Sequence, residues 1–252
     1  MADYKAIKGW TIQTVSSDPS NPIKGQVWYN STLGKLKGAK LQAGAWATGG
    51  NLNTARYAGA QAGTQTACLL MAGQNPAIRA YVESYDGSSW TEIADVNTGR
   101  KASCRAGTQT AALIICGNHP GVTNVESWDG SSWTETTDTS NARSHAAGGG
   151  IQTAALAVGG AQPGGSALNE QWDGSSWTEV GDLNTAVTLC GSNGTTSSMM
   201  VAGGQRAGEA YENICEQWDG SSWTEVADLN TARIDAGGCG DGELFLAAAG
   251  SI

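Results

Sequence analysis

The heptapeptide DGSSWTE at residues 86–92 occurs again, letter for letter, at residues 129–135, 173–179 and 219–225. Successive copies therefore begin 43, 44 and 46 residues apart. An enzyme active site needs one copy of each catalytic group, not four. Repetition at a period of roughly 40–50 residues is instead typical of repeat architectures, in which each copy builds one supersecondary unit.

Other residues keep a fixed distance from the heptapeptide. An arginine stands ten residues after the motif tryptophan in most copies, and Val187 replaces it in the third. The same spacing identifies a fifth copy, GAWATGGNLNTAR at residues 44–56, which resembles SSWTEVADLNTAR at residues 221–233. We expect each arginine to pair locally with an acidic or carbonyl group. The recurring positions, which we interpret as structural, are Trp46, Trp90, Trp133, Trp177, Trp223, Arg56, Arg100, Arg143 and Arg233.

Each copy reads as four short strands, named a to d in chain order. Strand a is rich in Gly and Ala, strand b is apolar and ends in Gly, and strands c and d flank the heptapeptide. Asp-Gly favours a hairpin because Gly supplies the positive φ that tight turns demand. Four strands per repeat predict an all-β fold, a five-bladed β-propeller of four-stranded blades. Strand a would line the axis, and the tryptophan of strand d would fill the gap between blades.

A family resemblance follows from these motifs. The glycines that end strand b, the aromatic-Asp-Gly turn and the later tryptophan resemble kelch repeats over residues 44–252. The pair Gly-Gly is intact only at residues 159–160 and 203–204, and strand a is unusually small. The resemblance implies a kelch-like propeller that departs from the common pattern in these features and in having five blades.

The last copy contains strands a and b but no strands c and d, since it ends in ELFLAAAGSI at residues 243–252. Three segments read as strands: QVWYNST at residues 26–32, KLKGAKL at residues 35–41 and AWATG at residues 45–49. We therefore expect N-terminal strands to complete the C-terminal blade and close the ring, which would remove open sheet edges. This predicts two parts: an N-terminal attachment segment or linker at residues 1–24 and the propeller at residues 25–252.

Charge divides the chain unevenly. The net charge is −9, yet residues 1–40 hold six Lys and two Asp, a local charge of +4, so the remainder carries −13. The part of the chain after residue 40 has no cluster of basic residues, which argues against nucleic acid as its partner. No apolar run is long enough for a membrane span, and the N-terminus lacks the apolar core of a secretory signal.

The N-terminal residues carry a second resemblance. GQVWYNSTLGKLKG at residues 25–38 is similar to a short element of phage tail-fibre and other virion proteins, and residues 1–22 resemble the N-termini of kelch-like proteins of marine phages. The resemblance implies a non-enzymatic virion protein, tail-fibre-like or capsid-decorating, with its propeller exposed on the virion surface. Lys5, Lys8 and Trp10 would attach it to other virion proteins, and the propeller would bind a host-surface glycan or protein.

Few residues offer catalytic or metal chemistry. The two histidines, His119 and His145, lie in different copies, and the six cysteines form no CxxC pair. We therefore expect no catalytic residues, no cofactor and no metal, and we interpret the cysteines as small apolar fillers. One residue before each Asp-Gly turn stands an aromatic that packs between blades or forms an exposed ring for stacking on sugars. These possible ligand-binding residues are Tyr85, Trp128, Trp172 and Trp218.

Two other functions remain open. The first is a soluble, extracellular lectin, whose near-identical blades would bind sugars multivalently. The second is a glycan hydrolase, which needs two carboxylates about 5–10 Å apart. Glu83 and Glu126 are examples of candidate acids, but nothing singles out a pair. The variable b–c connections are the expected recognition surface, because loops on a rigid scaffold usually carry binding.

Overall fold

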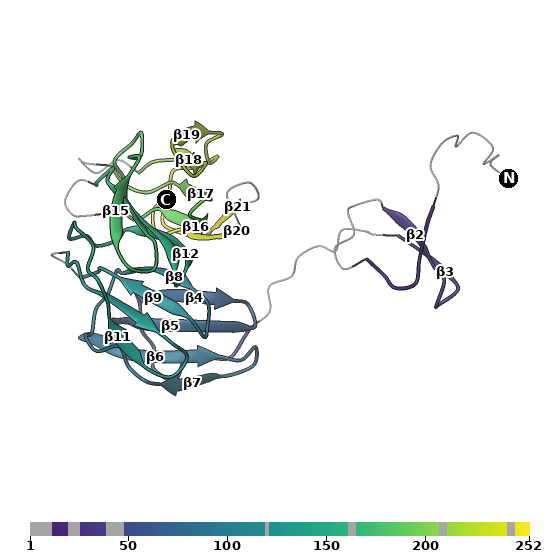
Figure 1. Ribbon diagram of the computed structural model, residues 1–252, viewed down its shortest axis with the longest axis horizontal. Coiled ribbons are helices and arrows are strands. Elements are labelled where there is room, and N and C mark those ends of the chain that lie inside the picture. Colours follow the sequence, from purple (N-terminus) through teal and green to yellow (C-terminus); the bar gives the residue numbers. More distant parts are fainter. Residues whose placement is uncertain are drawn as a thin grey trace. The chain divides into compact units, whose positions relative to one another are not determined.

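The computed structural model describes residues 12–19, 26–38, 48–118, 121–160, 165–206, 211–240 and 245–252. In these ranges, β-strands are the only regular elements (Figure 1). None of these residues lies in a helix that could cross a membrane. Contacts divide the chain into two compact units, Met1–Thr48 and Gly49–Ile252.

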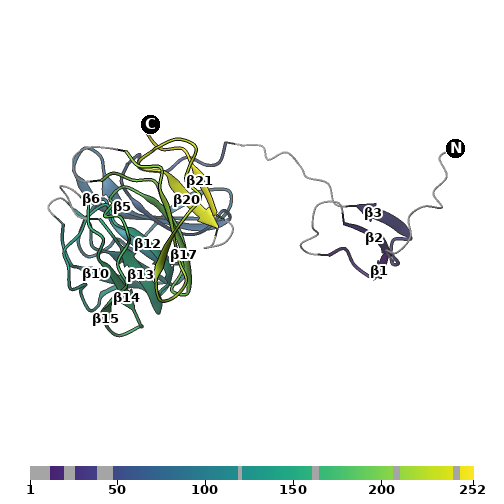
Figure 2. The same ribbon diagram turned by 90° about the horizontal axis from the view of Figure 1, so that it is seen from above.

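The N-terminal unit contains a three-stranded sheet in the order β1-β2-β3, seen together in Figure 2. Strand β1 (Gln13–Val15) pairs in parallel with β2 (Val27–Asn30), which pairs antiparallel with β3 (Lys35–Gly38). Asp18 holds the sheet together. Its carboxylate accepts hydrogen bonds from the side chains of Trp28 (2.9 Å), Asn30 (2.8 Å) and Lys37 (2.5 Å).

This sheet corrects the predicted boundary after residue 24. Because β1 pairs with β2, the residues on both sides of that boundary belong to one compact unit, which ends at Thr48. The predicted clasp also differs from the structure. Strand β2 pairs with β1 and β3, and neither β2 nor β3 pairs with the C-terminal strands in the described ranges. Most of the third predicted segment, residues 45–49, lies outside the described residues.

The C-terminal unit repeats one antiparallel sheet, as predicted. Four sheets have four strands each, and a fifth has two in the described part of the chain. We number these sheets repeats 1 to 5. Repeat 1 is β4 (Ala60–Thr64), β5 (Ala67–Gln74), β6 (Ile78–Tyr85) and β7 (Trp90–Ile93). Repeat 2 is β8 (Cys104–Gly107), β9 (Ala112–Ile115), β10 (Val125–Trp128) and β11 (Trp133–Glu135).

The next repeats follow the same order. Repeat 3 is β12 (Ala147–Ile151), β13 (Ala154–Val158), β14 (Asn169–Trp172) and β15 (Trp177–Val180). Repeat 4 is β16 (Gly191–Thr195), β17 (Ser198–Ala202), β18 (Cys215–Trp218) and β19 (Trp223–Val226). Repeat 5 is β20 (Gly237–Gly240) and β21 (Phe245–Ala248). Strands a and b are thus present in every repeat, while strands c and d are described in four.

The small first strands of the sheets lie side by side, as the propeller prediction requires. Strand β8 packs against β4 and β12, and β16 packs against β12 and β20 (Figure 1). Gly and Ala permit this approach. A Cβ on Gly148 would lie 2.8 Å from the Arg105 carbonyl oxygen, and one on Gly238 would lie 2.7 Å from Ser192 backbone atoms.

A chain of backbone hydrogen bonds links the residues just before these first strands. The N–H of Ala102 donates to Ala58, His145 to Ala102, Leu189 to His145, and Asp235 to Leu189, over 2.8–3.1 Å. All five residues have φ between 53° and 59°, a left-handed conformation that is uncommon outside glycine. No such bond joins Ala58 to Asp235 among the described residues. The arrangement is consistent with a β-propeller, with the chain of bonds open between repeats 1 and 5.

Three pairs of neighbouring sheets in the described part of the chain each enclose an apolar core. The core between repeats 1 and 2 joins Leu69, Met71 and Val82 to Ile114 of the next sheet. Equivalent cores lie between repeats 2 and 3 and between repeats 3 and 4. Two tryptophans from strands c and d fill each of the three cores. They are Trp128 with Trp133, Trp172 with Trp177, and Trp218 with Trp223.

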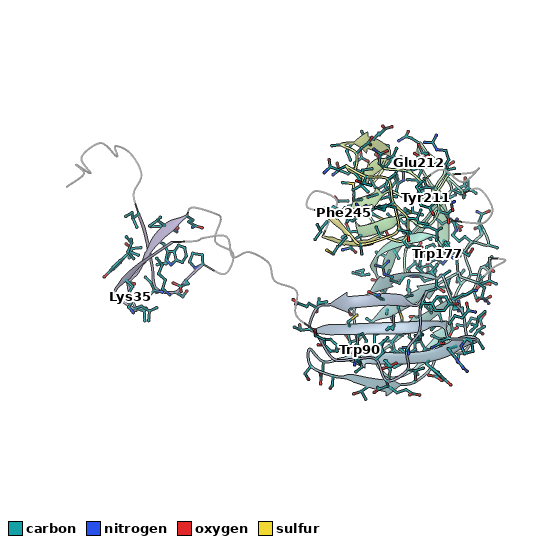
Figure 3. The ribbon with its side chains drawn as sticks, turned by 180° about the vertical axis from the view of Figure 1, so that it is seen from behind. Lys35, Trp90, Trp177, Tyr211, Glu212 and Phe245 are labelled. Atoms are coloured by element: carbon teal, nitrogen blue, oxygen red, sulfur yellow. The ribbon has the colours of Figure 1, made fainter. Side chains whose placement is uncertain are left out.

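Three of the five strand d tryptophans fill a gap between sheets, as predicted. Trp133, Trp177 and Trp223 are 7–8% exposed and lie between sheets. The indole N–H of Trp133 donates to the Ala94 carbonyl (3.0 Å) and that of Trp177 to Thr137 (3.1 Å), each in the previous repeat's connection. Trp90, on β7 in Figure 3, is half-buried, and Trp46 lies outside the described residues.

Replacing Trp133 with alanine should lower the free energy of unfolding by about 3–5 kcal/mol, because it leaves a cavity between two sheets. Trp90→Ala is the matched control, and its loss should be clearly smaller because this indole is already half exposed. Urea unfolding of both variants measures the difference. Equal losses of unfolding free energy would contradict the inference that the strand d tryptophan stabilises the fold by filling the space between two sheets.

Candidate functional site

The repeated heptapeptide folds as a self-capped turn. The Asp86 carboxylate accepts hydrogen bonds from the backbone N–H of Ser88 (2.9 Å) and Ser89 (2.8 Å) and from the Ser88 hydroxyl (2.8 Å). Gly87 has φ 94°, which no other residue type adopts readily. The other three copies make the same bonds. The four aspartates therefore stabilise the turns in which they stand.

A buried glutamate in strand c fixes the connection that enters each repeat. In repeat 2, Glu126 accepts hydrogen bonds from the backbone N–H groups of Asn97 (2.6 Å) and Thr98 (3.2 Å) and from the Arg100 guanidinium. Both charged side chains are 1% exposed. We call this arrangement of two backbone N–H groups and one arginine around a carboxylate the glutamate clamp.

The glutamate clamp recurs with small changes. Glu83 is held by Asn53, Thr54 and Arg56 in repeat 1, and Glu170 by Ser140, Asn141 and Arg143 in repeat 3. Burial alone raises the pKa of Glu83 and of Glu170, but the hydrogen bonds and the arginine together outweigh it and lower both pKa values.

Repeat 4 is the exception that the sequence indicated. Val187 occupies the arginine position, and it is 1% exposed. Glu216 instead accepts from the backbone N–H groups of Asn184 (2.8 Å) and Thr185 (2.9 Å) and from the Asn184 side chain (2.9 Å). The two backbone donors are therefore the constant part of the glutamate clamp. The expected local pairing of Arg56, Arg100 and Arg143 is confirmed, and Arg233 donates to the Ala249 carbonyl.

The structure corrects the possible role of the strand c aromatics as exposed sugar-stacking residues. Trp128, Trp172 and Trp218 are only 1–3% exposed, and their indole N–H groups donate to carbonyls in their own repeats. Tyr85 is half-buried. Each lies 5.0–5.4 Å from the strand d tryptophan of its hairpin, as a tilted ring pair. The three tryptophan rings pack between sheets, which was the alternative interpretation of their position.

A cavity of about 620 Å³ lies where the five repeats meet. The start of strand a from every repeat lines it, and Gln61, Arg105, His145, Ser192 and Asp235 are among its polar members. Arg105 Nε donates to the Gln61 carbonyl (2.6 Å), and burial lowers the pKa of its guanidinium. No ion pair of Arg105 is seen in the described ranges. We call this cavity the axial cavity and take it as the candidate site for a ligand, because every repeat contributes to its lining.

The titratable and metal-ligating side chains of the described residues lie apart from one another or in structural contacts. No group of His, Cys, Asp or Glu suited to hold a metal occurs in the described part of the chain. The six cysteines are unpaired there. Burial raises the pKa of Cys116 to about 11 and of Cys190 to about 12, so both remain protonated thiols. Glu83 and Glu126, candidates for a hydrolase, are buried in glutamate clamps.

Several expected site residues lie outside the described residues. They are Lys5, Lys8 and Trp10 of the attachment segment, Trp46 and His119. Three of the four variable b–c connections also fall partly there. His145 is described: it lines the axial cavity, and its φ of 53° belongs to the backbone pattern that all five repeats share.

The sequence did not reveal the glutamate clamp or Arg105. A signal for the clamp exists, because Glu83, Glu126, Glu170 and Glu216 all stand three residues before the motif aspartate. Arg105 has no counterpart in the other repeats, where Gln61, Gly148, Ser192 and Gly238 occupy its position. No protein-family model matches the chain, and no curated protein sequence matches it either.

The glutamate clamp predicts unequal costs for one substitution in two repeats. Glu126→Gln should lower the free energy of unfolding by about 3–5 kcal/mol, because it leaves the Arg100 charge buried without its partner. Glu216→Gln should cost about 1–3 kcal/mol, because it weakens hydrogen bonds but strands no cation. Urea unfolding compares the two variants. Equal losses would show that the arginine adds nothing to the clamp.

The turn aspartates predict a pH dependence. Hydrogen bonds from the serine backbone and hydroxyl groups lower the pKa of Asp86, Asp129, Asp173 and Asp219 from 3.8 to about 2. Because the folded pKa is depressed, this stabilisation is complete above about pH 4 and is lost as the pH falls toward 2.

Replacing all four aspartates with asparagine should keep the turns and remove this titration. The urea midpoint of the variant should therefore fall less between pH 4 and pH 2 than that of the unaltered chain. Midpoints at pH 7, 4, 3 and 2 provide the comparison. Parallel curves would mean that these carboxylates are not held by the serines in solution.

Proposed function

We propose that the protein is a non-enzymatic virion component, tail-fibre-like or capsid-decorating, in which the N-terminal unit attaches and the C-terminal unit is displayed for host-surface or protein binding. The observation that carries the proposal is the coincidence of charge and structure. Met1–Thr48 holds six Lys and two Asp, a net +4, while Gly49–Ile252 carries the remaining −13. A basic unit suits docking on an acidic structural protein, and an acidic body faces outward.

The resemblance of residues 1–38 to phage virion proteins supports the virion setting, and the kelch resemblance supports the display module. We infer that the repeats form a ring of five blades, with repeat 5 between repeats 4 and 1. Strands a from all five repeats line one axial cavity, as such a ring requires. The indole N–H groups of Trp133 and Trp177 donate to the connection that follows strand d of the previous repeat. The indole N–H of Trp90 donates to the Gly50 carbonyl (3.1 Å) in the same way, so residues 48–56 occupy the position of such a connection.

The recognition face in this proposal is the end of the sheets where strand a begins. The axial cavity opens there, and the variable b–c connections start from the same end because strand b runs antiparallel to strand a. Variable loops around a fixed cavity suit recognition of a surface group. A lectin that binds through its strand c aromatics is disfavoured, because those rings are buried.

Immunogold electron microscopy of assembled particles tests the attachment. Label against this chain should decorate the particles, and Lys5→Glu with Lys8→Glu should reduce the label strongly. Arg79→Glu with Arg206→Glu makes the same charge change in the C-terminal unit and should leave attachment intact. Unlabelled particles, with free protein that binds a glycan array, would contradict the virion role and favour a lectin.

A further inference from the structure

One residue of the axial cavity departs from the repeat. Arg105 stands on β8 at a position where the other repeats carry Gln61, Gly148, Ser192 and Gly238. A position that accepts Gln, Gly and Ser does not need an arginine to build the sheet. The shared architecture of the repeats therefore gives no reason for this cation to line the cavity.

The Arg105 guanidinium carries a charge that the described residues do not balance. The side chain is half-buried, and its Nε donates to the Gln61 carbonyl (2.6 Å). Within the described ranges, Nη1 and Nη2 make no hydrogen bond, and neither of them is a fully buried nitrogen. These two nitrogens are therefore accessible to a ligand in the cavity.

The other buried arginines show what such a group normally has as a partner. Arg56, Arg100 and Arg143 each pair with a glutamate of their own repeat. The ionisable groups that act on the pKa of Arg105 are instead the thiols of Cys104 and Cys68. A cation that is withdrawn from water without an anion costs free energy. An anion brought by a ligand would supply the missing partner.

The cavity also has an anionic member on another repeat. Asp235, which precedes β20 of repeat 5, lines the cavity and is exposed. It forms no ion pair with Arg105, although both line the same space. A ligand that suits both side chains carries a carboxylate at one end and hydrogen-bond donors such as hydroxyl groups at another.

Tyr57 adds an aromatic surface to the lining. Its side chain is 62% exposed, and two backbone hydrogen bonds to Gln74 (3.1 and 2.9 Å) fix its position. The equivalent residues of the other repeats are not aromatic: Lys101, Ser144, Thr188 and Ile234. An open tyrosine ring beside polar groups suits packing against the face of a sugar ring.

The size and lining of the cavity fit one sugar residue. Its volume of about 620 Å³ lies within the range of about 300–1,000 Å³ that is usual for small-molecule sites. Ala and Gly make up about half of the lining, so backbone polar groups lie close to a ligand and few large apolar side chains do. Such a lining favours a hydroxylated ligand over an apolar one.

We propose that the axial cavity binds a uronate, a sugar residue with a carboxylate on its ring, from a surface glycan. The carboxylate pairs with Nη1 and Nη2 of Arg105, the sugar ring packs on Tyr57, and hydroxyl groups donate to Asp235. A glutamate side chain of a protein would satisfy Arg105 but brings no hydroxyl groups for Asp235. The inference rests on the proposed function, because it names the group that the recognition face binds.

NMR titration of the full chain with glucuronate and with galacturonate tests the ligand class. The two probes differ in the configuration of one hydroxyl group, and at least one should bind with a Kd on the order of 1 mM or tighter. Glucose and galactose have the same rings without the carboxylate. They should bind about tenfold more weakly or worse, because the charge-assisted contact with Arg105 is lost.

Arg105→Gln places at this position the residue that repeat 1 carries there. It should weaken uronate binding by about tenfold or more and leave the urea midpoint no lower, because it removes an unpaired cation. Tyr57→Ala should also weaken binding, since it removes the aromatic surface. Lys35→Gln is the matched control. It removes one positive charge from β3 of the N-terminal unit (Figure 3) and should leave uronate binding unchanged.

Absence of binding by both uronates would overturn the proposal, as would binding that is indifferent to Arg105→Gln. Glutamate or acetate that binds as tightly as the uronates would overturn it too, because the cavity would then select a carboxylate and not a sugar. Failed uronate binding with immunogold label still on the particles would overturn this inference alone. Uronate binding with unlabelled particles would support it and contradict only the virion role.

Discussion

Each sheet of the C-terminal unit is a single layer with two apolar faces, so it cannot shield either face from water by itself. The rest of the structure follows from this constraint. Neighbouring sheets must cover one another. Their first strands are rich in Gly and Ala, which lets these strands approach closely. The sheets splay apart away from these strands. A pair of large aromatic rings from strands c and d fills each of the three enclosed gaps. Burial of such rings is the dominant stabilising term in a fold of this kind.

The glutamate clamp solves a second problem that the same geometry creates. The connection from the outer strand of one sheet to the inner strand of the next must turn sharply, which leaves backbone N–H groups near an apolar core. A buried carboxylate satisfies two of them at once, and the arginine balances its charge. Repeat 4 shows which part is essential. Val187 replaces the arginine there, yet Glu216 and both backbone contacts remain.

The sequence predicted the repeat, its strands and the wedge role of the tryptophans, because these depend on local patterns that recur in register. It assigned β2 and β3 to the last blade, whereas they form a separate sheet with β1. Their pairing with β1 depends on Asp18, a single residue that no periodicity marks. It also left the strand c aromatics open as a binding ring, since alternation along a strand cannot tell an inter-sheet gap from solvent. Arg105 was not anticipated, because a unique residue in a repeat has no pattern to identify it.

The central claim is a ring of five blades, and distances between equivalent exposed threonines test it directly. Spin labels at Thr91, Thr134, Thr178 and Thr224 lie at the same position of repeats 1 to 4. In a ring of five, repeats 1 and 4 are two steps apart through repeat 5. The distance between labels at Thr91 and Thr224 should therefore match those of Thr91 with Thr178 and Thr134 with Thr224. A distinctly longer distance between Thr91 and Thr224 would contradict the five-bladed ring and indicate an open array or a larger ring.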